Sequence, residues 1–211
     1  MDTNQLISVL SRGAGPATTF AVPRRLIPAS VVGLLASVLL SASLLGFLSA
    51  ESFQQPVTWV KLGYALALAL AAGLLTAALA KPVSRLARPS KLLLAVVGGM
   101  LLVGLVYFAL APGNEKSAAV HGQTWTSCSW TLMAFSLPAL LGILLVLRTL
   151  APTRLKLAGW ASGFLAGGLG AIGYALACPE SSPTFVAIWY TLGIFLTGLI
   201  GRLIAPVALR W

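Results

Sequence analysis

The sequence predicts an all-α, polytopic membrane protein with six transmembrane helices and both termini in the cytoplasm. Of its 211 residues, 58% are hydrophobic and only 9% are charged, and the mean hydropathy is +0.95. Soluble domains carry about 25% charged residues, so this composition excludes a soluble globular protein. Two further observations support the prediction: the apolar residues fall into six long runs, and the basic residues fall between them.

Each of the six apolar runs is long enough to cross a bilayer. A membrane-spanning helix needs about 20 mostly apolar residues, because each residue rises about 1.5 Å through a hydrocarbon core about 30 Å thick. The first run follows a polar segment that is too long for a typical cleaved signal peptide, so we interpret it as a retained span. The expected spans are residues 30–49, 60–80, 92–112, 130–148, 157–177 and 185–205.

The loop charges predict the orientation of these spans. With six spans, 12 basic residues fall on one side of the membrane, whereas the other side has only Lys61 and Lys116. Cytoplasmic loops are enriched in Lys and Arg, so the richer side and both termini are expected in the cytoplasm of a bacterial inner membrane. The 12 are Arg12, Arg24, Arg25, Lys81, Arg85, Arg88, Lys91, Arg148, Arg154, Lys156, Arg202 and Arg210.

The net charge of +10 does not indicate a nucleic-acid-binding protein, because the basic residues are spread between apolar runs rather than gathered on one face or tail. We therefore expect two parts: a cytoplasmic segment over residues 1–29 and a six-helix bundle over residues 30–211. Residues 2–12 predict a short amphipathic helix with Leu6, Ile7 and Leu10 on one face. This face needs a partner, which is either the membrane surface, the bundle or a cytoplasmic protein.

Small residues recur at spacing four in the last two spans. Gly159, Gly163 and Gly167 lie on one face of the fifth span, and Gly193, Thr197 and Gly201 lie on one face of the sixth. Because lipid provides little hydrophobic drive for helix association, small residues allow the close packing that holds membrane helices together. We expect tight packing of these spans, with a glycine-lined substrate path as the alternative.

The spans contain almost no ionisable residue at mid-depth, which disfavours a small transporter or channel. Such a protein remains the alternative function. A membrane thiol oxidoreductase is a weaker one, since the chain lacks a C-x-x-C motif. The residues indicate no catalytic group and no cofactor, and thus no enzyme.

The two cysteines are expected at the outer surface, with Cys128 just before the fourth span and Cys178 just after the fifth. Since these spans run antiparallel, their outer ends can meet, and a disulfide is plausible in an oxidising compartment. His121 and Glu180 are predicted on the same face, so that a metal-responsive site is the competing interpretation. No tight metal-binding spacing is present, and two inert cysteines are the third alternative.

Several stretches resemble the NrsF family of six-span bacterial inner-membrane anti-sigma factors, and together they cover nearly the whole chain. The more specific match is residues 178–183 followed by 185–190, and the looser matches are residues 3–7, 22–25, 128–129, 137–138, 151–153 and 174–176.

The resemblance implies regulation of transcription. It implies that the protein sequesters an extracytoplasmic-function sigma factor at the membrane and releases it under metal or oxidative stress. Outward cysteines are a family feature, matched by Cys128 and Cys178, with His121 and Glu180 as further sensing candidates. The candidate sigma-binding residues are on the inner side: Leu6, Ile7, Leu10, Arg24, Arg25, Arg85, Arg88, Arg154 and Lys156.

Overall fold

The computed structural model describes residues 2, 3, 5, 7–9, 21–81, 86–150 and 152–210. Every regular element in these ranges is helical, which confirms the predicted all-α class, and six helical stretches are long and apolar enough to cross a membrane. In chain order the elements are α2 (Ala21–Leu44), η1 (Ala50–Gln54), α3 (Pro56–Leu79), α4 (Ala87–Leu110), α5 (Lys116–His121), α6 (Trp125–Arg148), α7 (Leu155–Ala175), α8 (Pro183–Phe185), η2 (Val186–Tyr190) and α9 (Thr191–Ala208).

The first span differs most from its expected position. Helix α2 begins at Ala21 rather than at residue 30, so the boundary predicted at residue 30 falls inside it. Pro23 lies in the first turn, where its missing N–H costs nothing, and the helix continues through Pro28. It ends at Leu44 rather than at 49, and Gly46 follows with φ of 77°, a conformation that stops helices.

The remaining five helical stretches coincide with the expected spans to within five residues at each end. The sixth span is not one regular helix. It consists of the short α8, the π-helical turn η2 and the long α9. Residues 3, 5 and 7–9 are helical, whereas Leu6 and Leu10 of the predicted amphipathic helix lie outside the described residues.

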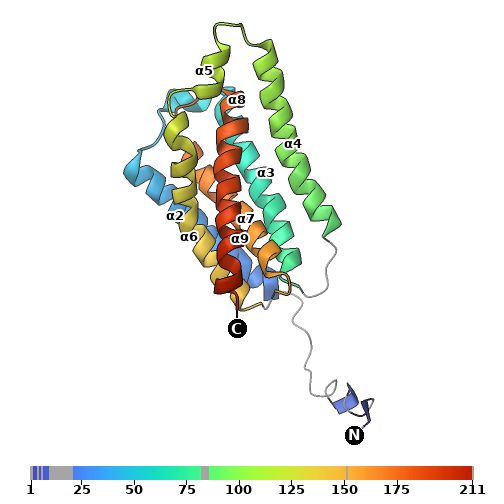
Figure 1. The fold of residues 1–211 in the computed structure, drawn as a ribbon. Coiled ribbons are helices and arrows are strands. Elements are labelled where there is room, and N and C mark those ends of the chain that lie inside the picture. Colours follow the sequence, from blue (N-terminus) through green and yellow to red (C-terminus); the bar gives the residue numbers. More distant parts are fainter. Residues whose placement is uncertain are drawn as a thin grey trace.

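The long helices alternate in direction, so the start of α2 and the end of α9 lie at the same end of the bundle (Figure 1). We call this the basic end; the other, where the segment between α7 and α8 lies, is the cysteine end. All the described basic residues of the predicted cytoplasmic side lie in loops or in the first or last two turns of helices at the basic end: Arg24, Arg25, Lys81, Arg88, Lys91, Arg148, Arg154, Lys156, Arg202 and Arg210.

Helix α7 forms the centre of the bundle, with 16 of its 21 residues buried. A Cβ added at Gly163 would lie 2.6 Å from the Cα of Gly198 on α9, and one at Gly168 would lie 3.0 Å from the Cα of Ala69 on α3. The backbone of α7 therefore lies close to the backbones of both α9 and α3, as small residues at an interface allow. The predicted packing of the last two spans is confirmed, except that Gly193 faces Ser129 and Leu132 of α6 rather than α7.

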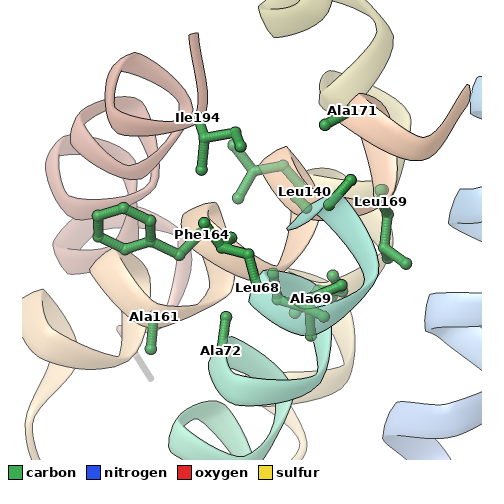
Figure 2. Packing of buried hydrophobic residues seen from close by; sticks show 14 of the residues in the cluster. Leu68, Ala69, Ala72, Leu140, Ala161, Phe164, Leu169, Ala171 and Ile194 are labelled. Atoms are coloured by element: carbon green, nitrogen blue, oxygen red, sulfur yellow. The ribbon is translucent and has the colours of Figure 1, made fainter. Parts of the chain in front are cut away.

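Apolar side chains of α7 and of three neighbouring helices meet in the core of the bundle (Figure 2). Leu68 and Ala72 of α3, Leu140 of α6 and Ile194 of α9 are all buried in this cluster with Phe164 of α7. In contrast, α2 and α4 are the least buried of the long helices and expose large apolar side chains such as Leu39, Leu94 and Leu110. Such exposed surface suits a lipid environment and not water.

Candidate functional site

The two cysteines are both buried at the cysteine end, one within a helix and the other in a non-helical segment. Cys128 lies in the first turn of α6, inside the helix rather than before it as expected. Cys178 lies just beyond the end of α7, as predicted, in the non-helical segment that leads to α8. Both are free thiols in the structure, with exposed fractions of 0% and 1%. A reagent that is to reach either sulfur must therefore open this end of the bundle.

Two tyrosines line the space around the thiols. The hydroxyl of Tyr174, in the last turn of α7, interacts with both Cys128 and Cys178. The ring of Tyr190, in the π turn η2, lies 5.6 Å from that of Tyr174. The Tyr190 hydroxyl is next to Cys178 and is fully buried, yet it forms no hydrogen bond of good geometry within the described residues. The two thiols and two phenols thus form one cluster, which we call the thiol–tyrosine cluster.

Lys61 lies beside this cluster and is itself buried. It is in the second turn of α3, with 1% of its surface exposed. Its Nζ donates to the carbonyl oxygen of Cys178 at 2.8 Å and to that of Glu180 at 2.7 Å. The sequence places Lys61 on the outer side, at the end of the second span, and the structure agrees on its place in the span, since α3 begins at Pro56 and holds the lysine in its second turn. Its burial and its two carbonyl partners are not predicted from the sequence.

The Glu180 side chain binds the start of α6. Its Oε1 accepts hydrogen bonds from the backbone N–H groups of Gln123 and Thr124, at 2.7 and 2.8 Å, and from Thr124 Oγ1 at 2.9 Å. Gln123 and Thr124 lie in the turn directly before α6. A carboxylate near the start of a helix also interacts favourably with the helix dipole. Glu180 therefore fixes the turn that leads into the helix that carries Cys128.

Further hydrogen bonds join the chain after Cys178 to the neighbouring helices. Ser182 Oγ donates to the carbonyl of Ala119 on α5 at 2.8 Å, and Thr184 Oγ1 donates to that of Gly104 on α4 at 2.9 Å. Trp189 Nε1 donates to the carbonyl of Val120 at 2.8 Å. The segment from Cys178 to Trp189 consequently contacts α3, α4, α5 and α6.

His121 is not part of the thiol–tyrosine cluster. It is exposed at the end of α5, where Nδ1 is 3.1 Å from the carbonyl oxygen of Ser117 and the ring packs edge-on against Trp125. In the described part of the chain, no three His, Cys, Asp or Glu side chains lie close enough together to hold a metal ion. The four sensing candidates therefore separate into two thiols of one cluster, a carboxylate bonded to the turn before α6 and a surface histidine.

The described sigma-binding candidates are all exposed at the basic end. Arg24 and Arg25 are in the first turn of α2, and Arg25 Nη1 donates to Thr149 Oγ1 at 2.9 Å. Arg88 begins α4, and Arg154 and Lys156 flank the start of α7. Ile7 is exposed as well. Arg85, like Leu6 and Leu10, lies outside the described residues.

Sequence reasoning assigned no site role to Lys61, Tyr174 or Tyr190. The sequence did indicate that Lys61 lies inside a helix. It follows Pro56 by five residues, and proline is favoured in the first turn of a helix; an uninterrupted apolar run comes after the lysine. The tyrosines gave no such signal, since an aromatic residue near a span end is most simply an interfacial anchor.

Comparison with known proteins places the chain in a regulatory family. Residues 10–211 match the family NrsF, described as "Negative regulator of sigma F". The chain is 38% identical over 218 residues to the "Anti-sigma-F factor NrsF" of Caulobacter vibrioides (strain NA1000 / CB15N), with both chains covered in full. It is 34% identical over 221 residues, again over the whole of both chains, to the "Probable anti-sigma-F factor NrsF" of Azospira oryzae (strain ATCC BAA-33 / DSM 13638 / PS). No solved structure matches it significantly.

Proposed function

The chain belongs to the NrsF family, and from this premise we propose how it acts as a membrane-bound anti-sigma factor. The role is regulatory rather than catalytic, and the observation that carries it is the match to two anti-sigma relatives over the whole chain. We propose that the partner is an extracytoplasmic-function sigma factor, bound at the cytoplasmic side of the inner membrane.

The basic end is the surface we assign to the sigma factor. It combines exposed guanidinium and ammonium groups of Arg24, Arg25, Arg88, Arg154 and Lys156 with an N-terminal segment that contains the exposed Ile7. Complementary charge steers partners together and adds specificity to a complex. An acidic patch on the sigma factor would suit this end, and the positive-inside rule supports placing it in the cytoplasm.

The cysteine end is the part we assign to sensing. The two buried thiols lie in one cluster and belong to different segments, so a chemical change at the pair alters the packing between them. Disulfide formation would join the two sulfurs and pass two electrons to an external oxidant, with loss of both thiol protons. A thiophilic metal ion would instead bind both sulfurs as thiolates.

Transmission between the two ends needs an element that both ends contact. Helices α6 and α7 meet this requirement. Cys128 lies in the first turn of α6 and Cys178 just after α7, while Arg154 and Lys156 lie at the connection between these helices at the basic end. We propose that modification of the thiols changes how α6 and α7 pack and thereby weakens sigma binding.

The experiment that tests the proposal is purification of the tagged, full-length protein from its own host in mild detergent. A sigma factor should co-purify in stoichiometric amount, and treatment with an oxidant or a thiophilic metal should reduce it. Reproducible absence of a sigma factor would contradict the partner. If the double variant Cys128→Ser, Cys178→Ser releases the sigma factor as readily as the native protein, the sensing proposal is wrong while the anti-sigma role stands.

A further inference from the structure

A buried lysine within an apolar helix needs a compensating interaction, because an ionisable residue at membrane depth is costly. Lys61 is among the largest fully buried side chains of the described residues, and it reaches across to the segment after α7. There it bonds two backbone carbonyls, those of Cys178 and Glu180, two residues apart. The lysine thus fixes the backbone on both sides of Pro179.

Glu180 ties the same segment to a second helix. Its carbonyl oxygen accepts the hydrogen bond from Lys61 on α3, while its carboxylate accepts three hydrogen bonds at the start of α6. One residue therefore connects α3 to α6. The connection on the α6 side is made four to five residues before Cys128, in the turn that leads into that cysteine's helix.

Gly122 leaves room for this carboxylate. It has φ of 54°, which favours glycine, and a Cβ at this position would lie only 2.7 Å from Cδ of Glu180. Any side chain here would push the carboxylate away from the N–H groups of Gln123 and Thr124. The turn before α6 is thus shaped around Glu180.

We propose that Lys61 and Glu180 are positioning residues that hold Cys178 buried beside Cys128, as the two halves of a polar clasp. The burial of the two cysteines depends on this clasp to different degrees. Cys128 is held by the helix that contains it. Cys178 lies between α7 and α8, where its N–H donates to the carbonyl of Tyr174 in α7 and its own carbonyl oxygen is bonded by Lys61. This inference rests on the proposed sensing function, because it explains how the sensor is assembled from two segments.

The inference predicts a selective effect on the accessibility of the two thiols. In the Cys128→Ser background, Cys178 should react with a maleimide at least tenfold faster in Lys61→Met or Glu180→Leu than in the otherwise native protein. In the Cys178→Ser background, the same changes should leave the rate for Cys128 within about twofold. Gly122→Ala should reproduce the effect of Glu180→Leu. Lys61→Arg, which keeps N–H donors, and Glu180→Gln, which keeps an acceptor oxygen, should each retain most of the protection of Cys178.

Matched controls are available at the same end of the bundle. Lys116→Met and Glu115→Leu alter charged residues outside the clasp, and neither should change the reactivity of Cys178. Reaction rates are measured in membranes of an expression host that lacks the cognate sigma factor, and size-exclusion chromatography in detergent monitors folding. If Lys61→Met does not give a monodisperse protein, the Glu180→Leu and Gly122→Ala variants decide.

Two outcomes would overturn the clasp. One is unchanged reactivity of Cys178 in Glu180→Leu and Gly122→Ala. The other is an equal rise at both cysteines, which would show general loosening of the bundle. Neither outcome bears on sigma binding, because the alkylation assay uses the protein without a sigma factor. Failure of the clasp can therefore be told apart from failure of the proposed function.

Discussion

Individual polar groups at the cysteine end differ in whether they have a hydrogen-bond partner. The Tyr64 hydroxyl is 2.8 Å from Thr191 Oγ1, and Ser129 Oγ donates to the carbonyl of Trp189 at 2.9 Å. The hydroxyl of Tyr190 is fully buried and has no well-formed hydrogen bond among the described groups. An unsatisfied buried hydroxyl costs free energy and often marks a functional position. Here it lies next to Cys178, whose chemical state is the proposed signal.

Removing this hydroxyl should not destabilise the protein. Tyr190→Phe deletes a group without a good partner, so the melting temperature in detergent should stay the same or rise. Tyr64→Phe is the matched control, because it breaks a hydrogen bond and leaves Thr191 unpaired. It should lower the free energy of unfolding by about 1 kcal/mol. A lower melting temperature for Tyr190→Phe than for Tyr64→Phe would show that the Tyr190 hydroxyl has a strong partner.

At the scale of elements, α7 differs from every other helix in the bundle. It is buried on nearly all sides and carries glycines toward several neighbours: Gly163 faces α9, Gly168 faces α3, Gly170 faces α6 and Gly173 faces α2. Ser37 Oγ of α2 also donates to the carbonyl of Gly170 at 3.3 Å. A displacement of α7 must therefore change its packing against four other helices, and this suits an element that transmits a signal between the two ends.

A methyl group in the α7–α9 interface should disturb this packing. Gly163→Ala places a Cβ 2.6 Å from the backbone of Gly198, and such overpacking costs about 1–3 kcal/mol of stability. Gly98→Ala on α4 is the matched control, since its Cβ would meet no atom within 4 Å, and it should be neutral or stabilising. Thermal unfolding in detergent measures both. Equal melting temperatures would mean that the two helices separate easily.

Across the whole molecule, charge is distributed unequally between the two ends. The described cations of the basic end face few acidic residues, whereas the cysteine end has Glu51, Glu115 and Glu180 against Lys61 and Lys116. The net charge of +10 is thus concentrated at one end. Both the predicted orientation and the proposed docking of an acidic partner depend on this asymmetry.

The orientation is testable with reporter fusions. Alkaline phosphatase, which is active only outside the cytoplasm, should be inactive when fused after Arg210 and active when inserted after Gly113 in the loop between α4 and α5. Green fluorescent protein fused after Arg210 should fluoresce. The reverse pattern would place the cysteines in the cytoplasm and would contradict the sensing proposal as stated.

Reversing charge at the basic end should weaken the complex with the sigma factor. The double variant Arg154→Glu, Lys156→Glu should retain at least tenfold less co-purified sigma factor, and added salt should weaken the native complex in the same direction. Lys116→Glu, at the opposite end, is the control and should retain the native amount. Undiminished binding by the double variant would shift the docking surface to other residues of the basic end or to the N-terminal segment.

The sequence alone determined the membrane class, the six spans, the segregation of charge and the packing of the last two spans through small residues. These properties follow from local composition and periodicity, because a bilayer imposes the same length and polarity on any segment that crosses it. Only the tertiary structure placed Lys61 on the carbonyls of Cys178 and Glu180, and the Glu180 carboxylate on the turn that precedes α6. Lys61 and Glu180 are 119 residues apart in the chain. Contacts of this kind depend on which segments the bundle brings together, and no local sequence pattern predicts them.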